Sequence, residues 1–160
     1  MKALQPPSMP RRRRGAIIGL ALLGACASAA QAASFTMFRD PGCGCCLAWA
    51  AHVEVRKPHR VKTVDHRDMA AVKARHGVPA DLRSCHTAIV EGYVIEGHVP
   101  VSEVERLLAE RPAWVEGLAV AAMPLGSPGM EAGGRVQPYK VIAFGNGRRE
   151  VFASYPRPRP

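Results

Sequence analysis

Three of the chain's cysteines fall within the four residues CGCC at 43–46, where the sequence pattern changes from strand to helix. The preceding run SFTMF at 34–38 alternates like a strand, and RDPGCG at 39–44 has the composition of a turn. A helix is then predicted from Cys45 to about Val55, with an apolar stripe at helical spacing that consists of Leu47, Ala48, Ala51 and Val55. The cysteines are therefore expected at a helix N-terminus, where free backbone N–H groups and the helix dipole favour thiolates.

Thiolates at such a position serve two kinds of chemistry. Cys43 and Cys46 alone form a C-x-x-C pair, the spacing of thiol–disulfide exchange, whereas the three sulfurs together suit a soft metal ion. A third thiol beside an exchanging pair invites scrambling, so Cys45 favours the metal. Structural disulfides are a further alternative, although a bridge between the neighbours Cys45 and Cys46 would be strained.

Residues 1–32 have the pattern of a signal peptide. Arg11–Arg14 precede an apolar run, 16–25, that is short for a membrane span, and small residues end in AQA at Ala32. We predict cleavage after Ala32 and export to a bacterial periplasm. The alternatives are an uncleaved anchor, a lipidated Cys26 after LGA, and a twin-arginine signal.

Export would also remove much of the chain's positive charge. The whole chain has 22 Lys and Arg against 13 Asp and Glu, a net charge of +9. Residues 1–32 contain Lys2 and Arg11–Arg14 but no acid, so the exported part carries +4. It has no cluster of basic and aromatic residues, so no binding of nucleic acid is expected. No membrane span is expected in the mature protein either.

The exported chain is expected to form one domain over 33–155. RVKTVDH at 60–66 alternates as a strand, Asp68 caps a helix that ends at Gly77, and Glu91-Gly92 joins two β-rich runs as a hairpin. A further helix is predicted over 101–112. The order β-α-β-α-β-β-α is that of a thioredoxin-like α/β sandwich.

A loop and a hairpin are expected to extend this domain at its C-terminal end. Residues 113–137 are rich in Gly, Pro and Ala and predict an ordered or semi-ordered loop, whose length suggests a function. Asn146-Gly147 predicts the turn of a β-hairpin. Residues 156–160, PRPRP, predict a disordered tail.

Cys85, the fourth cysteine of the exported part, is expected to face the other three. In a thioredoxin-like chain the segment that enters the third strand approaches the C-x-x-C helix, and here it contains Cys85 and His86 where a cis-proline is usual. Four thiols and an imidazole favour a metal site, and thiolates select Cu(I), zinc or iron–sulfur clusters. Met123 and Met130 of MPLGSPGM add thioethers, which favour Cu(I), and His98 lies at the end of the predicted hairpin.

Several of these residues also fit roles that do not involve copper. The methionines could fill gaps under the loop, and four cysteines could hold zinc or an iron–sulfur cluster. The spacing matches no ferredoxin pattern, however, and a chain this apolar hardly needs zinc to fold. The remaining histidines are expected at the surface without a role (His52, His59, His66 and His76), and both tryptophans, Trp49 and Trp114, in the core.

The motifs CGCC, LRSCHTAIVEGYVIEGHVP and MPLGSPGM closely resemble those of the CopG-type periplasmic copper-resistance proteins, also known as domain of unknown function 411. The resemblance extends from about Phe35 to Phe152. It implies a thioredoxin-like domain that binds copper through cysteine thiolates as a multi-copper cluster, with a role in copper redox handling. The implied ligands are Cys43, Cys45, Cys46 and Cys85, with His98, Met123 and Met130 at further matching positions.

The function expected from these observations is the binding of several Cu(I) ions in copper resistance, with interconversion of copper oxidation states as a further activity. Copper ions and other periplasmic copper-handling proteins are the expected partners. The alternative is a thiol–disulfide oxidoreductase that uses Cys43 and Cys46.

Overall fold

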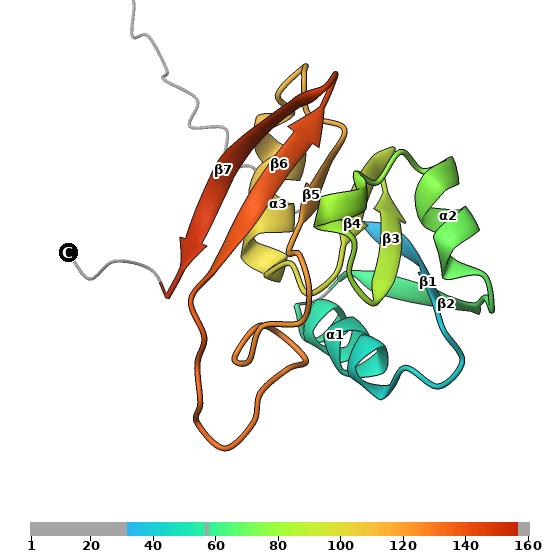
Figure 1. Cartoon of the computed structure of the whole chain (residues 1–160), viewed down its shortest axis with the longest axis vertical. Coiled ribbons are helices and arrows are strands. Elements are labelled where there is room, and N and C mark those ends of the chain that lie inside the picture. The colour runs from blue at the N-terminus through green and yellow to red at the C-terminus, as the bar shows by residue number, and fades with distance from the viewer. Residues whose placement is uncertain (1–31, 57, 157–160) are drawn as a thin grey trace, which may run out of the picture. The chain divides into compact units, whose positions relative to one another are not determined.

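The computed structural model describes residues 32–56 and 58–156, which form a seven-stranded mixed sheet with three α-helices (Figure 1). This is the α/β class that the sequence predicts. The predicted signal peptide, with Cys26, lies outside the described residues except for Ala32, and so does the predicted tail except for Pro156. Within the described part, no helix has the length and apolar character that a membrane span requires.

The first seven regular elements follow the predicted order β-α-β-α-β-β-α. The elements along the chain are β1 (Ser34–Arg39), α1 (Gly44–Val55), β2 (Arg60–Asp65), α2 (Met69–Arg75), a 3₁₀ turn (Ala80–Leu82), β3 (His86–Val90), β4 (Tyr93–Glu96), α3 (Val101–Glu110), β5 (Gly117–Ala119), β6 (Tyr139–Gly145) and β7 (Arg148–Tyr155). The strand order is β2-β1-β3-β4-β5-β6-β7, with β1 parallel to β2 and antiparallel to β3. This pairing places the end of β1 beside the start of β3.

Helices pack on both faces of the sheet. One face carries the main core, in which Phe35 and Met37 of β1 pack with Trp49 and Val53 of α1 and with apolar residues of α3. Residues of the opposite face contact α2, since the ring of Phe38 lies 5.6 Å from that of His76. Alternate residues of a strand point to opposite faces, so the alternating pattern of β1 supplies both layers.

The two predicted hairpin turns are confirmed. Glu91 and Gly92 have φ values of 47° and 86°, and Asn146 and Gly147 have values of 50° and 73°. Positive φ at both central residues is the backbone of the two-residue turn that matches strand twist. The register that follows pairs Thr87 with Glu96 across β3 and β4.

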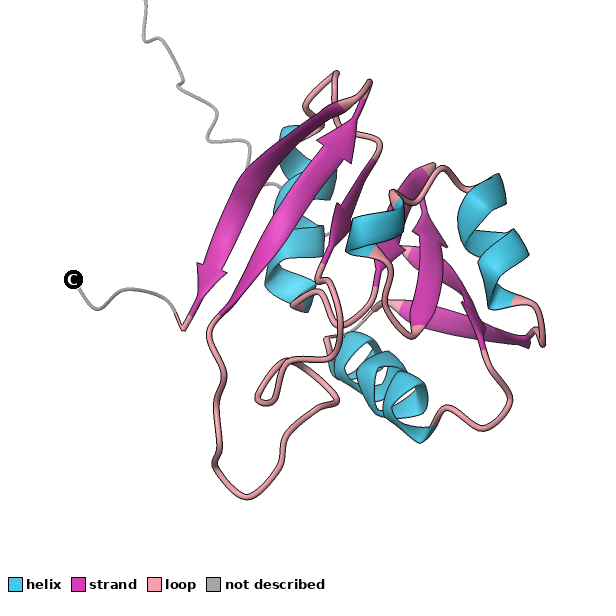
Figure 2. Cartoon of the chain, in the orientation of Figure 1, coloured by secondary structure: helices cyan, strands magenta, loops and turns pink. Residues whose placement is uncertain are grey.

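The prediction of an unbroken loop over 113–137 is wrong, because residues Gly117–Ala119 form β5. This short strand pairs parallel with β4 and antiparallel with β6, so it joins the C-terminal hairpin to the rest of the sheet. Three residues are too few to show a periodic pattern. Gly117 is required there, since a Cβ would lie 2.2 Å from the carbonyl oxygen of Val94. The remaining loop, between β5 and β6, runs beside α1 (Figure 2).

The helix predicted from the cysteines is confirmed, but its predicted apolar stripe is wrong. Leu47 is 46% exposed and Val55 is 80% exposed, whereas the buried residues are Cys46, Trp49, Ala50 and Val53. The helix is apolar on most of its circumference, so spacing alone does not identify the inner face. Trp49 decides it, because a large aromatic side chain contributes most when it is buried.

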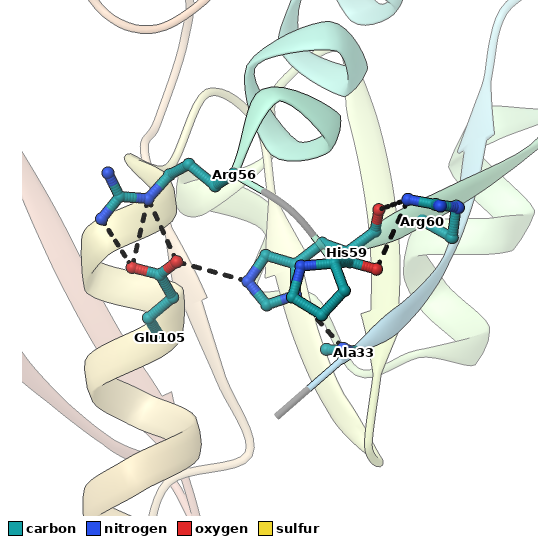
Figure 3. A network of polar contacts seen from close by, with 6 residues as sticks. Ala33, Arg56, His59, Arg60 and Glu105 are labelled. Carbon is teal, nitrogen blue, oxygen red and sulfur yellow. Dashed lines mark hydrogen bonds and ion pairs between the residues drawn. The ribbon is translucent and has the colours of Figure 1, made fainter. Parts of the chain in front are cut away.

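His59 is buried, contrary to the predicted surface position. Its Nδ1 accepts a hydrogen bond from the backbone N–H of Ala33 at 3.1 Å, so Nε2 carries the proton and faces Glu105 Oε1 at 3.3 Å (Figure 3). Arg56 binds the same carboxylate, with Nη2 2.7 Å from Oε2. This contact network ties the start of β1 and the end of α1 to α3.

Candidate metal site

The four cysteines of the described chain meet at the N-terminus of α1. Cys43 is the residue before the helix, Cys45 and Cys46 lie in its first turn, and Cys85 comes from the segment just before β3. Their sulfur atoms all lie within 4.8 Å of one another. The antiparallel pairing of β1 and β3, with Arg39 opposite His86, brings the two segments together.

Arg39 supports the loop that carries Cys43. Its side chain is largely buried, and Nη1 donates to the carbonyl oxygen of Cys43 at 3.0 Å and to those of Asp40 and Pro41 at 3.3 Å. Nη2 forms an ion pair with Asp65 at 2.9 Å. One guanidinium group therefore organises the turn that leads into the helix.

Cys43 and Cys46 are joined by a disulfide, with their Cα atoms 5.5 Å apart. Cys45 and Cys85 are the free cysteines of the described chain, and the Cys45 sulfur lies 3.5 Å from that of Cys43. The C-x-x-C pair therefore has the geometry for reversible oxidation. The reduced site would offer four thiols, and the oxidised site offers two.

Two histidines complete a second set of donor atoms around Cys85. His86 Nδ1 lies 3.2 Å from the Cys85 sulfur, and His98 Nε2 lies 3.0 Å from it. His98 Nδ1 donates to the carbonyl oxygen of Pro128 at 2.8 Å, and this hydrogen bond leaves Nε2 as the acceptor that faces Cys85. A hydrogen bond of this kind is what orients a metal-binding imidazole.

Burial controls the protonation of this second set. It is the main cause that lowers the pKa of His86 well below its usual value, and it also lowers the pKa of His98. Burial raises the pKa of Cys85 to about 12, and the charge of Cys45 adds to the rise. The imidazoles are therefore neutral donors at neutral pH. Cys85 keeps its proton until a metal ion displaces it, since thiolate is the form that binds metal.

The loop between β5 and β6 packs against the start of α1. Gly129 has φ +84°, and a Cβ on it would lie 2.7 Å from the backbone nitrogen of Trp49 and 2.9 Å from the carbonyl oxygen of Cys45. Only glycine allows this approach. The preceding residue, Pro128, supplies the carbonyl group that orients His98.

The two methionines of this loop lie in different surroundings. Met130 follows Gly129 directly and is partly buried. Met123 is 48% exposed and lines a surface hollow with Pro124 and Tyr139. A ligand role for either methionine stays a prediction.

The two tryptophans, both expected in the core, differ in their surroundings, and Trp49 also contacts the site. Trp49 is fully buried, as expected, but its ring also packs against that of His86, with centroids 4.6 Å apart, and its Nε1 donates to the carbonyl oxygen of Val99 at 2.8 Å. Trp114, expected in the core, is only partly buried. Sequence spacing contains no signal for the contact of Trp49 with His86, because it joins residues far apart in the chain.

The fold and the site define a small mixed α/β protein with a cysteine and histidine cluster that could bind a metal ion. DUF411, described as a protein of unknown function, matches residues 82–130. Two solved structures are similar to the chain. "Copper resistance protein copG- Form 2" is 40% identical with a TM-score of 0.74, and the match covers 79% of this chain and 100% of that one. "Copper resistance protein copG- Form 1" is 41% identical with a TM-score of 0.72, covering 77% and 97%.

The chain therefore belongs to the DUF411 family of CopG-like copper resistance proteins. No curated protein sequence matches it significantly. The cysteine and histidine cluster is the feature of this chain through which a role in copper resistance can be argued.

Proposed function

We propose that this protein binds several Cu(I) ions on the thiolates of Cys43, Cys45, Cys46 and Cys85. The observation that carries the proposal is the convergence of all four sulfur atoms within 4.8 Å of one another. Thiolates are soft donors that select Cu(I), and a thiolate can bridge two metal ions. The similarity to copper resistance proteins supports copper as the metal.

The other proposed ligands are less central to the cluster. His86 and His98 contact Cys85 and would complete the coordination of an ion bound to its sulfur. Met130 is supported by its position next to Gly129, which packs on α1, and Met123 is the ligand with the weakest support because it lines a separate hollow. Replacing each methionine by leucine and measuring the Cu(I) affinity separates the two.

The Cys43–Cys46 disulfide supports a redox role for the same site. Two Cu(II) ions would each accept one electron from the two thiolates of the reduced pair, giving two Cu(I) ions and the disulfide. Any thiol protons would pass to solvent. Disulfide formation also removes two of the four thiolates and so favours release of bound copper. Return to the reduced pair requires a two-electron dithiol reductant.

The test is reconstitution of the fully reduced protein with Cu(I) under anaerobic conditions. We expect more than one ion per chain, and loss of this capacity in Cys43→Ser and Cys85→Ser. His66→Asn is the matched control, since the partly exposed imidazole of His66 lies outside the cysteine and histidine cluster and accepts a hydrogen bond from the Asp68 N–H at 3.2 Å. Unchanged copper binding in both cysteine variants would refute the proposal.

The thioredoxin-like fold is the architecture that these observations favour. The parallel β1–β2 pair, the antiparallel β3–β4 pair and a C-x-x-C disulfide at the start of α1 all support it. The same disulfide supports the second candidate function, a thiol–disulfide oxidoreductase that uses Cys43 and Cys46. Efficient reduction of insulin by the metal-free protein, abolished in Cys46→Ser, would favour that function over copper binding.

Export to the periplasm is proposed from the sequence of residues 1–32. Cleavage after Ala32 would begin the mature chain at Ala33, which is buried in contact with His59. Cell fractionation and mass analysis of the N-terminus test this proposal, and a lipid-modified Cys26 would refute cleavage at Ala32.

A further inference from the structure

A buried ion pair between Lys73 and Glu96 contacts the segment that carries Cys85. Glu96, at the end of β4, is fully buried, and its carboxylate accepts three hydrogen bonds. Lys73 Nζ donates to Oε1 at 2.6 Å, the backbone N–H of Ser84 to Oε1 at 2.6 Å, and Thr87 Oγ1 to Oε2 at 2.7 Å. Lys73, from α2, is 5% exposed and lies 3.1 Å from Thr87 Oγ1.

This network joins the two segments that carry Cys85 and His98. Ser84 immediately precedes Cys85, and Glu96 stands two residues before His98. Between them, the N–H of Gly97 donates to the carbonyl oxygen of His86 at 2.9 Å. Gly97 has φ +71°, and a Cβ on it would lie 2.5 Å from Ser84 Cβ, so the two segments lie too close together at this point for any residue but glycine.

We propose that Glu96, held by Lys73 and Thr87, is a positioning group that keeps Cys85 and His98 at ligand distance from each other. The Cys85 sulfur and His98 Nε2 are 3.0 Å apart. The Glu96 carboxylate accepts a hydrogen bond from the N–H of Ser84, the residue before Cys85. Glu96 itself ends β4, the strand that leads to His98. A buried ion pair is weak evidence for stability, because apolar residues of similar size often stabilise a core equally well or better. The proposal rests on the proposed function, in which copper binds to Cys85.

A positioning role and an electrostatic role of the ion pair predict different effects of single substitutions on Cu(I) affinity. Glu96→Gln removes a negative charge from behind the site, and Lys73→Met removes a positive one. If the pair acted through its electric field on the thiolates, the two variants would change Cu(I) affinity in opposite directions. If it acts by positioning, both variants weaken binding, and so does the uncharged change Thr87→Val, which tests the network in a chain with less risk of misfolding.

The experiment uses reduced protein and two measurements. The first, without copper, is amide hydrogen exchange of the peptides that contain Ser84 and Gly97, which we expect to be faster in all three variants. The second is Cu(I) affinity by competition with a chelator, expected to fall roughly 10- to 100-fold, as for other groups that orient metal ligands. Glu103→Gln is the control, because Glu103 is an equally buried carboxylate whose contacts include Arg106 and Tyr155 on α3 and β7.

The outcomes separate the two proposals. Opposite changes in affinity for Glu96→Gln and Lys73→Met would overturn positioning in favour of charge. Faster exchange with unchanged affinity, or the same loss of affinity in Glu103→Gln, would overturn it as well. A wild-type protein that binds no Cu(I) would refute the proposed function, while unchanged hydrogen exchange in the variants would refute positioning independently of copper.

Discussion

Replacing Gly129 by alanine should detach the loop that covers the start of α1. Two costs add at this position. A non-glycine residue at φ +84° costs about 1–2 kcal/mol, and forcing a methyl group into packed backbone costs about 1–3 kcal/mol. The contacts are close, 2.7 Å to the nitrogen of Trp49 and 2.9 Å to the oxygen of Cys45, and helix backbone moves less easily than a side chain. The total is therefore about 2–5 kcal/mol.

Gly134→Ala is a matched control for this change. Gly134 has φ +74° in the same loop, but a Cβ on it would have no neighbour within 4 Å, so it carries only the conformational cost. Urea unfolding measures the free energy of unfolding, and limited proteolysis of folded protein measures the opening of the loop. We expect Gly129→Ala to be less stable than Gly134→Ala by about 1–3 kcal/mol, or to be cleaved faster if the loop opens locally. Equal stability and equal cleavage would refute the close packing of Gly129 on α1.

Three further substitutions test other contacts. The hydrogen bond from Arg56 lowers the pKa of Glu105 in the folded protein. The ionised carboxylate therefore stabilises the fold at pH values above its unfolded pKa of about 4.3. This contribution is lost as the pH falls through the lower pKa of the folded state. Melting temperatures between pH 7 and pH 3 should therefore fall less steeply for Glu105→Gln than for wild type, from a lower starting value. Trp49→Phe leaves the buried carbonyl group of Val99 without its partner and should lower the free energy of unfolding in urea by about 1–3 kcal/mol. Arg39→Met loosens the turn before α1, so a small thiol should reduce the nearby disulfide faster, as measured by alkylation and mass spectrometry.

The fold could be predicted where the sequence pattern is local. The two turns with Glu91-Gly92 and Asn146-Gly147 are determined by residues that accept positive φ, and the helix predicted over 101–112 forms as α3, which buries Val101, Val104 and Leu107. β5 could not be predicted, because it forms only when its three residues lie between two partner strands. His59 was misplaced for a similar reason, since its partners Ala33 and Glu105 come from distant parts of the chain.

The cysteine part of the site could be predicted because it lies where a helix begins and where a neighbouring strand begins. The neighbouring network of Glu96, Lys73 and Thr87 is not predicted, although the sequence contains one signal of it. A hairpin centred on Glu91-Gly92 pairs Thr87 with Glu96, two polar residues opposite each other in strands that, His86 aside, are mainly apolar. Such a pair indicates a buried polar contact that needs a further partner. Lys73 could not be assigned as that partner from spacing, because its helix meets the sheet only after folding.

The position of Cys45 within CGCC matters for what oxidation does to the site. If the site consisted of the C-x-x-C pair alone, forming the Cys43–Cys46 disulfide would remove every thiolate from it. In this chain the oxidised form still has the free thiols of Cys45 and Cys85, and His86 and His98 both contact Cys85. Thiolates are the donors that select Cu(I), whereas imidazole also suits Cu(II). Oxidation of the pair would thus change the kind of donors offered to copper as well as their number, and Cys85 belongs to both donor sets.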